Sequence, residues 1–312
     1  MPEQREMRMS YVNTLIALAE ENKDIVVLEA DMMACTNTGA FKKAYPSRFI
    51  NCGIAEANMI GIASGLSTLG KIPFAAGFGS FSSRRVFDQF FISANYARLN
   101  VKLTGTDPGV AANVNGGTHM PFEDLAMMRV IPGLTVIEPS DPVSAAALVR
   151  LMAEEYGCHY LRLHRKPVPV LYPENEKFKF GQAKILKEGK DICFVALGSL
   201  MVNQSLKACE TLAASGISAG VLDVLTIKPL DHDAILEQAG KVRAIITAEN
   251  AQIRGGLGGA TAEILAENGC RCKFARIGVR DQFGEVGSQD YLIDRFGLDV
   301  GSLVKKAQEL LG

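Results

Sequence analysis

The stretch NCGIAEANMIGIASGLSTLG, residues 51–70, holds the unit from which the fold can be read. A short apolar run ends near Cys52, Gly53 suits a turn, and a nearly all-apolar helical pattern follows. The same order of a short apolar run and then a helical pattern recurs along the whole chain. Runs of this kind between helices are typical of parallel strands covered on both faces. The fold class is therefore predicted to be α/β, with two domains based on parallel sheets.

The predicted strands fall into two series, separated by a polar, proline-containing stretch at 172–190. The first series comprises residues 24–30, 48–54, 72–78, 101–106, 134–140 and 159–164. The second series comprises residues 191–199, 218–225, 243–250 and 272–279. Two domains also suit the length, because single cores rarely grow beyond about 250 residues. We predict a first domain over 1–178 and a second over 179–312.

One helix carries a full set of boundary signals. In SDPVSAAALVRLMAEEYG, residues 140–157, Ser140 or Asp141 can cap the helix and Pro142 suits its first turn. Gly157 is predicted to end it.

The composition excludes several classes of function. The chain has 312 residues, 48% of them hydrophobic, and a formal net charge of -1, so no broad basic field is available for nucleic acid. No apolar stretch reaches membrane-spanning length, and the N-terminus lacks the pattern of a signal peptide. The seven cysteines are odd in number and have no CxxC spacing, so we expect reduced thiols and a cytoplasmic protein.

Glu56 opens the apolar helix of the first stretch and has two interpretations. A carboxylate at a helix N-terminus is favoured by the helix dipole, and this explains its position. A helix that is apolar on most faces is buried, however, and a buried carboxyl group is suited to proton transfer. The local sequence leaves both interpretations open.

Two further segments follow predicted strands, where parallel sheets bind ligands. Phe78 and Phe81 lie among glycine and serine after strand 72–78, and a flat ring beside small residues can support a planar heterocycle. His119 lies on a loop rich in glycine and asparagine after strand 101–106. No zinc spacing accompanies this histidine, so no metal site is predicted.

The glycine-rich segment RGGLGGATAEILAENG, residues 254–269, matches the dinucleotide pattern G-x-G-x-x-G poorly. It also follows a late strand rather than a first one. We interpret it as a tight turn into a helix.

Taken together and in this order, these segments resemble the pyrimidine-binding domain of the transketolase family, including the subgroup of deoxyxylulose-phosphate synthase. The resemblance is carried by GIAEANMIGIASGL (53–66), FGSFSSRRVFDQ (78–89) and GGTHMPFEDLAMMRVIPGLTVIEPSD (116–141). Further on, TAENAQIRGGLGGATAEIL (247–265) resembles the family's C-terminal domain. The resemblance covers nearly the whole chain and implies that it is the C-terminal half of a thiamine-diphosphate-dependent enzyme.

The resemblance also implies roles at the cofactor. Glu56 corresponds to the glutamate that bonds N1′ of thiamine diphosphate and so promotes removal of the proton from C2. Phe81 corresponds to the residue that stacks on the aminopyrimidine, with Phe78 beside it. Arg84 belongs to the version of this segment found in the synthase subgroup and is expected at the cofactor. The reaction implied is transfer of a two-carbon ketol unit from a ketose, or ketose phosphate, to an aldose.

A second group of residues is implied at the substrate. His119 matches the histidine that contacts the ketose and is expected to be catalytic, and Arg165 lies near the family's substrate-phosphate arginine. Two positions depart from the family pattern: Asn115 replaces an aspartate, and Asp107 replaces a histidine that transketolases usually carry. Both are expected to bind substrate, and the departures make an unusual ketose a candidate donor.

One expected motif is absent. The family's diphosphate-binding domain carries GDG and a later asparagine, which hold Mg²⁺ on the diphosphate, and no GDG occurs in this chain. We therefore expect a separate N-terminal subunit that carries GDG and holds the Mg²⁺ (or Ca²⁺), in a heterotetramer of two copies of each chain. We also expect the chain to self-associate, to act on sugar or sugar-phosphate substrates, and to bind neither nucleic acid nor a membrane.

Two alternatives are weaker. The β subunit of a 2-oxoacid dehydrogenase E1 component has the same two domains, but its loop usually carries a His-Ser-Gln-type sequence where this chain has GGTHMPFEDLA. A ligand-binding paralogue without catalysis is disfavoured because Glu56, Phe81 and His119 are all retained.

Overall fold

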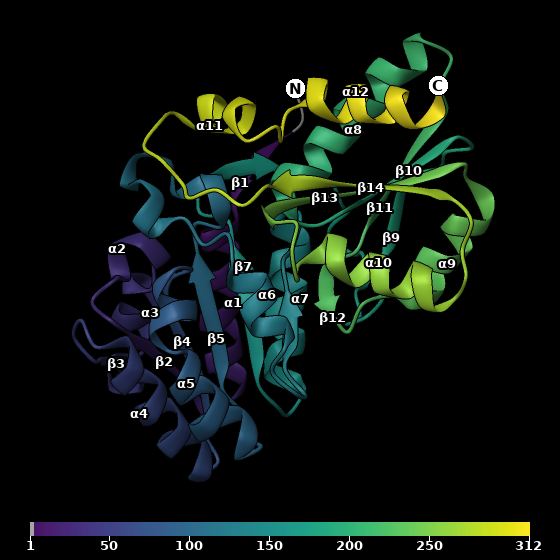
Figure 1. Ribbon diagram of the computed structural model, residues 1–312. Coiled ribbons are helices and arrows are strands. Elements are labelled where there is room, and N and C mark those ends of the chain that lie inside the picture. Colours follow the sequence, from purple (N-terminus) through teal and green to yellow (C-terminus); the bar gives the residue numbers. More distant parts are fainter. Residues whose placement is uncertain (1–2) are drawn as a thin grey trace.

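The computed structural model describes residues 3–312 and arranges the strands in two large sheets and one small one (Figure 1). The seven-stranded sheet runs, in spatial order, through β12 (Thr226–Lys228), β6 (Thr135–Ile137), β7 (His159–Leu163), β5 (Lys102–Thr106), β4 (Ile72–Phe78), β2 (Ile25–Glu29) and β3 (Phe49–Asn51). The five-stranded sheet runs through β14 (Lys273–Val279), β13 (Ala244–Gln252), β10 (Ile192–Ala196), β11 (Ala219–Asp223) and β9 (Lys184–Lys187). The small sheet pairs β1 (Gln4–Glu6) with β8 (Pro167–Pro169).

The helices lie on both faces of the large sheets. They are α1 (Met7–Glu21), α2 (Met33–Thr36), α3 (Gly39–Ala44), α4 (Glu56–Thr68), α5 (Phe87–Gln89), α6 (Asp124–Arg129), α7 (Pro142–Glu154), α8 (Gly198–Ala214), α9 (His232–Lys241), α10 (Leu257–Glu267), α11 (Gln289–Arg295) and α12 (Val300–Leu311). The remaining helical segments have 3₁₀ or π geometry and are Pro46–Arg48, Phe81–Arg85, Phe90–Tyr96, Gly109–Asn115 and Gly117–His119.

The α/β class predicted from the apolar runs is confirmed, and every predicted strand has a counterpart. Within the seven-stranded sheet, β3, β2, β4, β5, β7 and β6 pair in parallel. β12 pairs with β6 in the antiparallel sense, and so does β9 with β11. These antiparallel edge strands were not predicted, and β9 lies inside the polar stretch 172–190 that separates the two series of predicted strands.

The N-terminus of α7 is formed by the capping residues that the sequence predicted. The Asp141 side chain accepts a hydrogen bond from the backbone N–H of Ser144, whose hydroxyl group in turn bonds the Asp141 backbone, and Pro142 occupies the first turn. This reciprocal cap satisfies donors that a helix start otherwise leaves unpaired. The helix ends at Glu154, before the Gly157 that the sequence suggested.

Apolar clusters span the two halves of the chain. A single cluster joins Met59 of α4 and Leu103 of β5 to Val195 of β10 and Ile264 of α10. β12 likewise extends the first sheet, although it comes from the second half of the chain. The division at 178/179 stays a prediction, and the two halves form one packed body. Within residues 3–312, no helix is both long and apolar enough to cross a membrane.

Candidate active site

Glu56 lies where the sequence predicted, in the first turn of α4, after a turn in which Gly53 has a φ of 68°. Its side chain is almost fully buried, with 5% of the residue exposed. One carboxylate oxygen, Oε1, accepts a hydrogen bond from Nη1 of Arg85 at 2.9 Å. The other oxygen accepts no hydrogen bond within residues 3–312, so it is free to pair with a donor on a ligand.

The aromatic residues and the histidine that the sequence singled out come together at the carboxyl ends of β4 and β5. The ring centroids of Phe78 and Phe81 are 6.0 Å apart and the rings are nearly perpendicular. His119 lies 5.4 Å from Phe78 and 5.1 Å from Phe81, again at steep angles. Two segments that are distant in sequence thus form one cluster.

The two arginines after Phe81 point to different partners. Arg85 lies over the Phe81 ring, with its guanidinium carbon 3.9 Å from the ring centroid, while it also bonds Glu56. Arg84 donates to the backbone carbonyl of Thr118 at 2.6 Å and pairs with Glu123. Arg84, the arginine expected at the cofactor, therefore holds the loop that carries His119. Arg85, which the sequence analysis did not single out, joins Glu56 to Phe81.

Asp107 and Arg165 form a pair beside the aromatic cluster. Asp107 follows β5 with a φ of 58° and is fully buried. Its Oδ1 lies 3.1 Å from Nε of Arg165, an ion pair without the alignment of a hydrogen bond. Burial raises the pKa of the Asp107 carboxyl group, and the Arg165 guanidinium opposes that rise. The Arg165 guanidinium is 5.9 Å from the Phe78 ring, so this pair borders the cluster.

Asn115 is the expected site residue that stays apart. Its side chain is exposed and makes no hydrogen bond in the described part of the chain. It lies on the irregular segment Gly109–Asn115, in which Asn113 has a φ of 24°. Its role at a substrate stays a prediction.

The loop that carries His119 is packed against a loop from the second half of the chain. A Cβ added to Gly117 would collide with the backbone carbonyl group of Gly284, and one added to Gly116 would lie 2.9 Å from Val286. Gly284 in turn lies against the Sδ atom of Met120. This contact could not be predicted from the sequence, because loop 280–288 carries no signal that links it to residues so far away.

These side chains fit the aminopyrimidine of thiamine diphosphate. A planar heterocycle needs a flat aromatic wall, and Phe81 with Phe78 supplies one. A protonated ring nitrogen needs a carboxylate, and the unpaired oxygen of the buried Glu56 supplies it. Residues 3–312 contain no group of three or more His, Cys, Asp or Glu side chains placed to hold a metal ion.

Comparison with protein families gives two matches. Residues 3–170 match the model for the transketolase pyrimidine-binding domain, and residues 181–303 match that for the transketolase C-terminal domain.

Comparison with individual proteins gives relatives of the same kind. The chain is 48% identical to the 6-deoxy-6-sulfo-D-fructose transketolase subunit of Clostridium sp. (strain MSTE9), over 99% of this chain and 95% of that protein. It is 35% identical to one of the subunits of the apulose-4-phosphate transketolase of Phocaeicola vulgatus, over 97% of each. A solved structure described as a split-gene transketolase in an inactive beta4 tetramer superposes with a TM-score of 0.90 at 40% identity, over 99% of both chains.

Proposed function

The chain belongs to the transketolase family, and we propose that it is one subunit of a thiamine-diphosphate-dependent transketolase that transfers a two-carbon ketol unit from a ketose to an aldose. The observation that carries this proposal is the cluster of Glu56, Phe78, Phe81 and His119. These residues come from three separate segments. The two phenylalanines and His119 meet at the carboxyl ends of two parallel strands, and Arg85 links Glu56 to Phe81.

The proposed roles follow from this geometry. Glu56 would accept a hydrogen bond from the aminopyrimidine, and Phe81 and Phe78 would hold the flat face of that ring. When bound, thiamine diphosphate would supply the nucleophilic carbon and the electron sink for cleaving a carbon–carbon bond beside a carbonyl group. His119 lies against both aromatic rings and would bond the hydroxyl groups of the ketose.

We propose that a second chain completes the site. This chain lacks GDG, and two of its relatives are described as transketolase subunits. The partner would carry the diphosphate-binding domain and hold Mg²⁺, in a heterotetramer of two copies of each chain. The relative described as an inactive beta4 tetramer supports self-association and a requirement for the partner. All seven cysteines are free thiols, which supports a reducing compartment, the cytoplasm.

The donor is proposed to be an unusual ketose that carries an anionic group. The relatives are described as acting on 6-deoxy-6-sulfo-D-fructose and on apulose 4-phosphate. Arg165 is 24% exposed in its side chain and anchored by the buried Asp107, so it presents a fixed guanidinium group beside Phe78. Such a group suits a sulfonate or phosphate.

The test uses the chain assembled with a partner that carries GDG. Glu56→Gln should lower kcat by roughly 100-fold or more, because a neutral amide cannot share the proton. Glu20→Gln, a change at an exposed helical glutamate, is the matched control. Normal turnover in Glu56→Gln would refute the assignment, and decarboxylation of 2-oxoacids without ketose turnover would favour the dehydrogenase alternative.

A further inference from the structure

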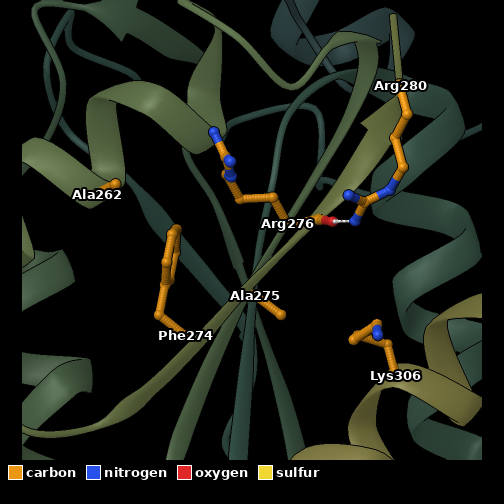
Figure 2. Close-up of a pocket in the computed structure, with 6 residues that line it drawn as sticks. All are labelled: Ala262, Phe274, Ala275, Arg276, Arg280 and Lys306. Atoms are coloured by element: carbon orange, nitrogen blue, oxygen red, sulfur yellow. Dashed lines mark hydrogen bonds between the residues drawn. The ribbon is translucent and has the colours of Figure 1, made fainter.

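A hollow of about 460 Å³ opens at the free edge of the five-stranded sheet, away from the residues of the candidate active site. Its lining comes from β14, the turn that follows this strand, α10 and α12 (Figure 2). The lining residues are Ala262, Phe274, Ala275, Arg276, Arg280 and Lys306. The lining thus combines three apolar residues with three cationic side chains.

The two arginines carry most of the unneutralised charge at this hollow, because Lys306 pairs with Glu309 on α12. No carboxylate lines it, and the ion pairs formed within residues 3–312 include neither Arg276 nor Arg280. A neighbouring hollow of about 470 Å³ shares Arg280 and Lys306 and adds Arg295, Lys305 and Glu309. Glu309 pairs with Lys306 there, and Glu285 pairs with Arg295. The chain as a whole has a formal net charge of -1, so this concentration of cations does not follow from composition.

The guanidinium groups are held in place by backbone carbonyls. Arg276 donates to the carbonyl of Ile253 at 2.9 Å, and Arg280 donates to the carbonyl of Arg276 at 2.8 Å, the contact dashed in Figure 2. Gly258, at the start of α10, makes room for Arg276, because a Cβ there would lie 2.6 Å from the arginine's Cδ. A guanidinium group has five N–H donors, so each arginine keeps several for a ligand.

Charged side chains at a sheet edge also have a purely structural use, since they keep exposed strands from pairing with other chains. That use requires neither a hollow nor cations that converge on it. The parallel N–H groups of an arginine guanidinium match two oxygens of a phosphate. Lys306 adds a third positive charge from α12.

We propose that this hollow binds a small phosphorylated anion at a site separate from catalysis. The ligand would place its phosphate between Arg280 and Lys306 and any apolar part on Ala275, which lies on the same side of β14 as Lys306 (Figure 2). The proposal is independent of the transketolase reaction, because none of these residues belongs to the Glu56 cluster.

The experiment is calorimetric titration of the full chain with inorganic pyrophosphate, and with inorganic phosphate in parallel. The double variant Arg280→Gln/Lys306→Gln should weaken pyrophosphate binding roughly tenfold or more, because each charge-assisted contact contributes about that factor. Lys190→Gln/Lys207→Gln removes the same charge from exposed positions elsewhere and should bind as the unmodified chain does. Arg165→Gln should also leave binding unchanged, which separates this site from the proposed substrate arginine.

Three results would overturn the proposal: no pyrophosphate binding by the unmodified chain, equal weakening in the two double variants, or loss of binding in Arg165→Gln alone. Circular dichroism verifies that each variant is folded. Should the double variant be unfolded, Arg280→Lys provides the test, since it keeps the charge but loses the fork and should still weaken binding.

Discussion

At the scale of single residues, Arg85 connects the two side chains that the proposed function needs most. It bonds the Glu56 carboxylate at 2.9 Å and lies 3.9 Å from the centroid of the Phe81 ring. Its side chain is half exposed, so the ion pair contributes little to folding. Its effect is on orientation, because it fixes one oxygen of Glu56 and leaves the other for a ligand.

Replacing Arg85 should therefore affect the cofactor, and replacing Arg84 should affect the substrate. In the assembled enzyme, we expect Arg85→Ala to weaken thiamine diphosphate binding and to lower kcat roughly tenfold, since a charged hydrogen bond contributes about that factor. Arg84→Ala loosens the loop of His119 and should mainly raise KM for the ketose. Cofactor titration followed by fluorescence, together with steady-state kinetics, distinguishes them, and identical profiles for the two variants would contradict these roles.

The sequence predicted the cluster of Glu56, Phe78, Phe81 and His119, but it did not predict that Arg85 contacts Glu56. The two arginines are adjacent in sequence, and only the phase of the helical turn Phe81–Arg85 decides which one faces Glu56. Residues four apart share one face of a helical turn, so Arg85 returns to Phe81. This turn is π-helical, and the pattern of apolar residues does not predict which side chains of such a turn face Glu56.

Glu29, at the end of β2, makes the chain's stability depend on pH. Its Oε1 accepts hydrogen bonds from the hydroxyl groups of Thr36 at 2.5 Å and Thr38 at 2.6 Å, and its Oε2 has no partner within residues 3–312. Burial raises the pKa of Glu29 to about 7, against the lowering effect of these hydrogen bonds. A raised carboxyl pKa means that the folded state favours the protonated form. The stabilising contribution of Glu29 is therefore complete below pH 4.5 and is lost as the pH rises through about 7.

Glu29→Gln should remove this dependence. Between pH 5 and pH 8, ionisation of Glu29 should lower the free energy of unfolding of the unmodified chain by on the order of 2–3 kcal/mol. The Glu29→Gln variant should not show this loss. Urea unfolding at the two pH values measures the difference. An unchanged difference would show that the buried Glu29 carboxyl group is not protonated near neutral pH in the folded chain.

At the scale of elements, the loop of His119 depends on a loop from the second half of the chain. Gly117 lies directly against Gly284, and Gln252 at the end of β13 accepts from the backbone N–H of Asp281 at 3.0 Å and anchors that second loop. The second half of the chain thus helps to position a residue of the first.

Gly117→Ala tests this contact. The added methyl group would push the two loops apart, so we expect KM for the ketose to rise roughly tenfold, the loss that a misplaced substrate-binding group causes. Binding of thiamine diphosphate should stay the same, because Glu56 and Phe81 lie on other elements. Gly240→Ala, on α9 with nothing within 4 Å of the added carbon, is the control. Unaltered kinetics in Gly117→Ala would contradict the positioning role.

The elements that the sequence predicted are those whose apolar residues follow one another, such as β4 and β10. The missed strands have other signatures. β12 has three residues and pairs with β6 from the other half of the chain, and β9 alternates between half-buried and exposed positions in a polar stretch. Their pairing is decided by tertiary contacts, which local periodicity does not contain.

At the scale of the whole molecule, Arg162 ties the two halves together from a fully buried position. It pairs with Asp124 at 2.8 Å and with Glu138 at 2.5 Å, both from the first half. Its Nη2 also donates to the carbonyl of Asn250, at 3.1 Å, from the second half. The Asn250 side chain in turn donates a hydrogen bond to the carbonyl of Pro108, in the first half, at 2.8 Å. A buried charge that is paired on both sides contributes little net stability, but breaking one such pair is costly.

Arg162→Met should therefore lower the free energy of unfolding by roughly 3–5 kcal/mol at neutral pH, because two buried carboxyl groups lose their cation. The matched change Arg150→Met breaks an exposed pair with Glu21 and should cost about 1 kcal/mol or less. Adding Asp124→Asn and Glu138→Gln to Arg162→Met should recover part of the loss, since no uncompensated carboxylate then stays buried. Urea unfolding measures all three. Equal losses in Arg162→Met and Arg150→Met would mean that the halves are held by apolar packing alone, and recovery in the triple variant would identify the unpaired charges as the cause.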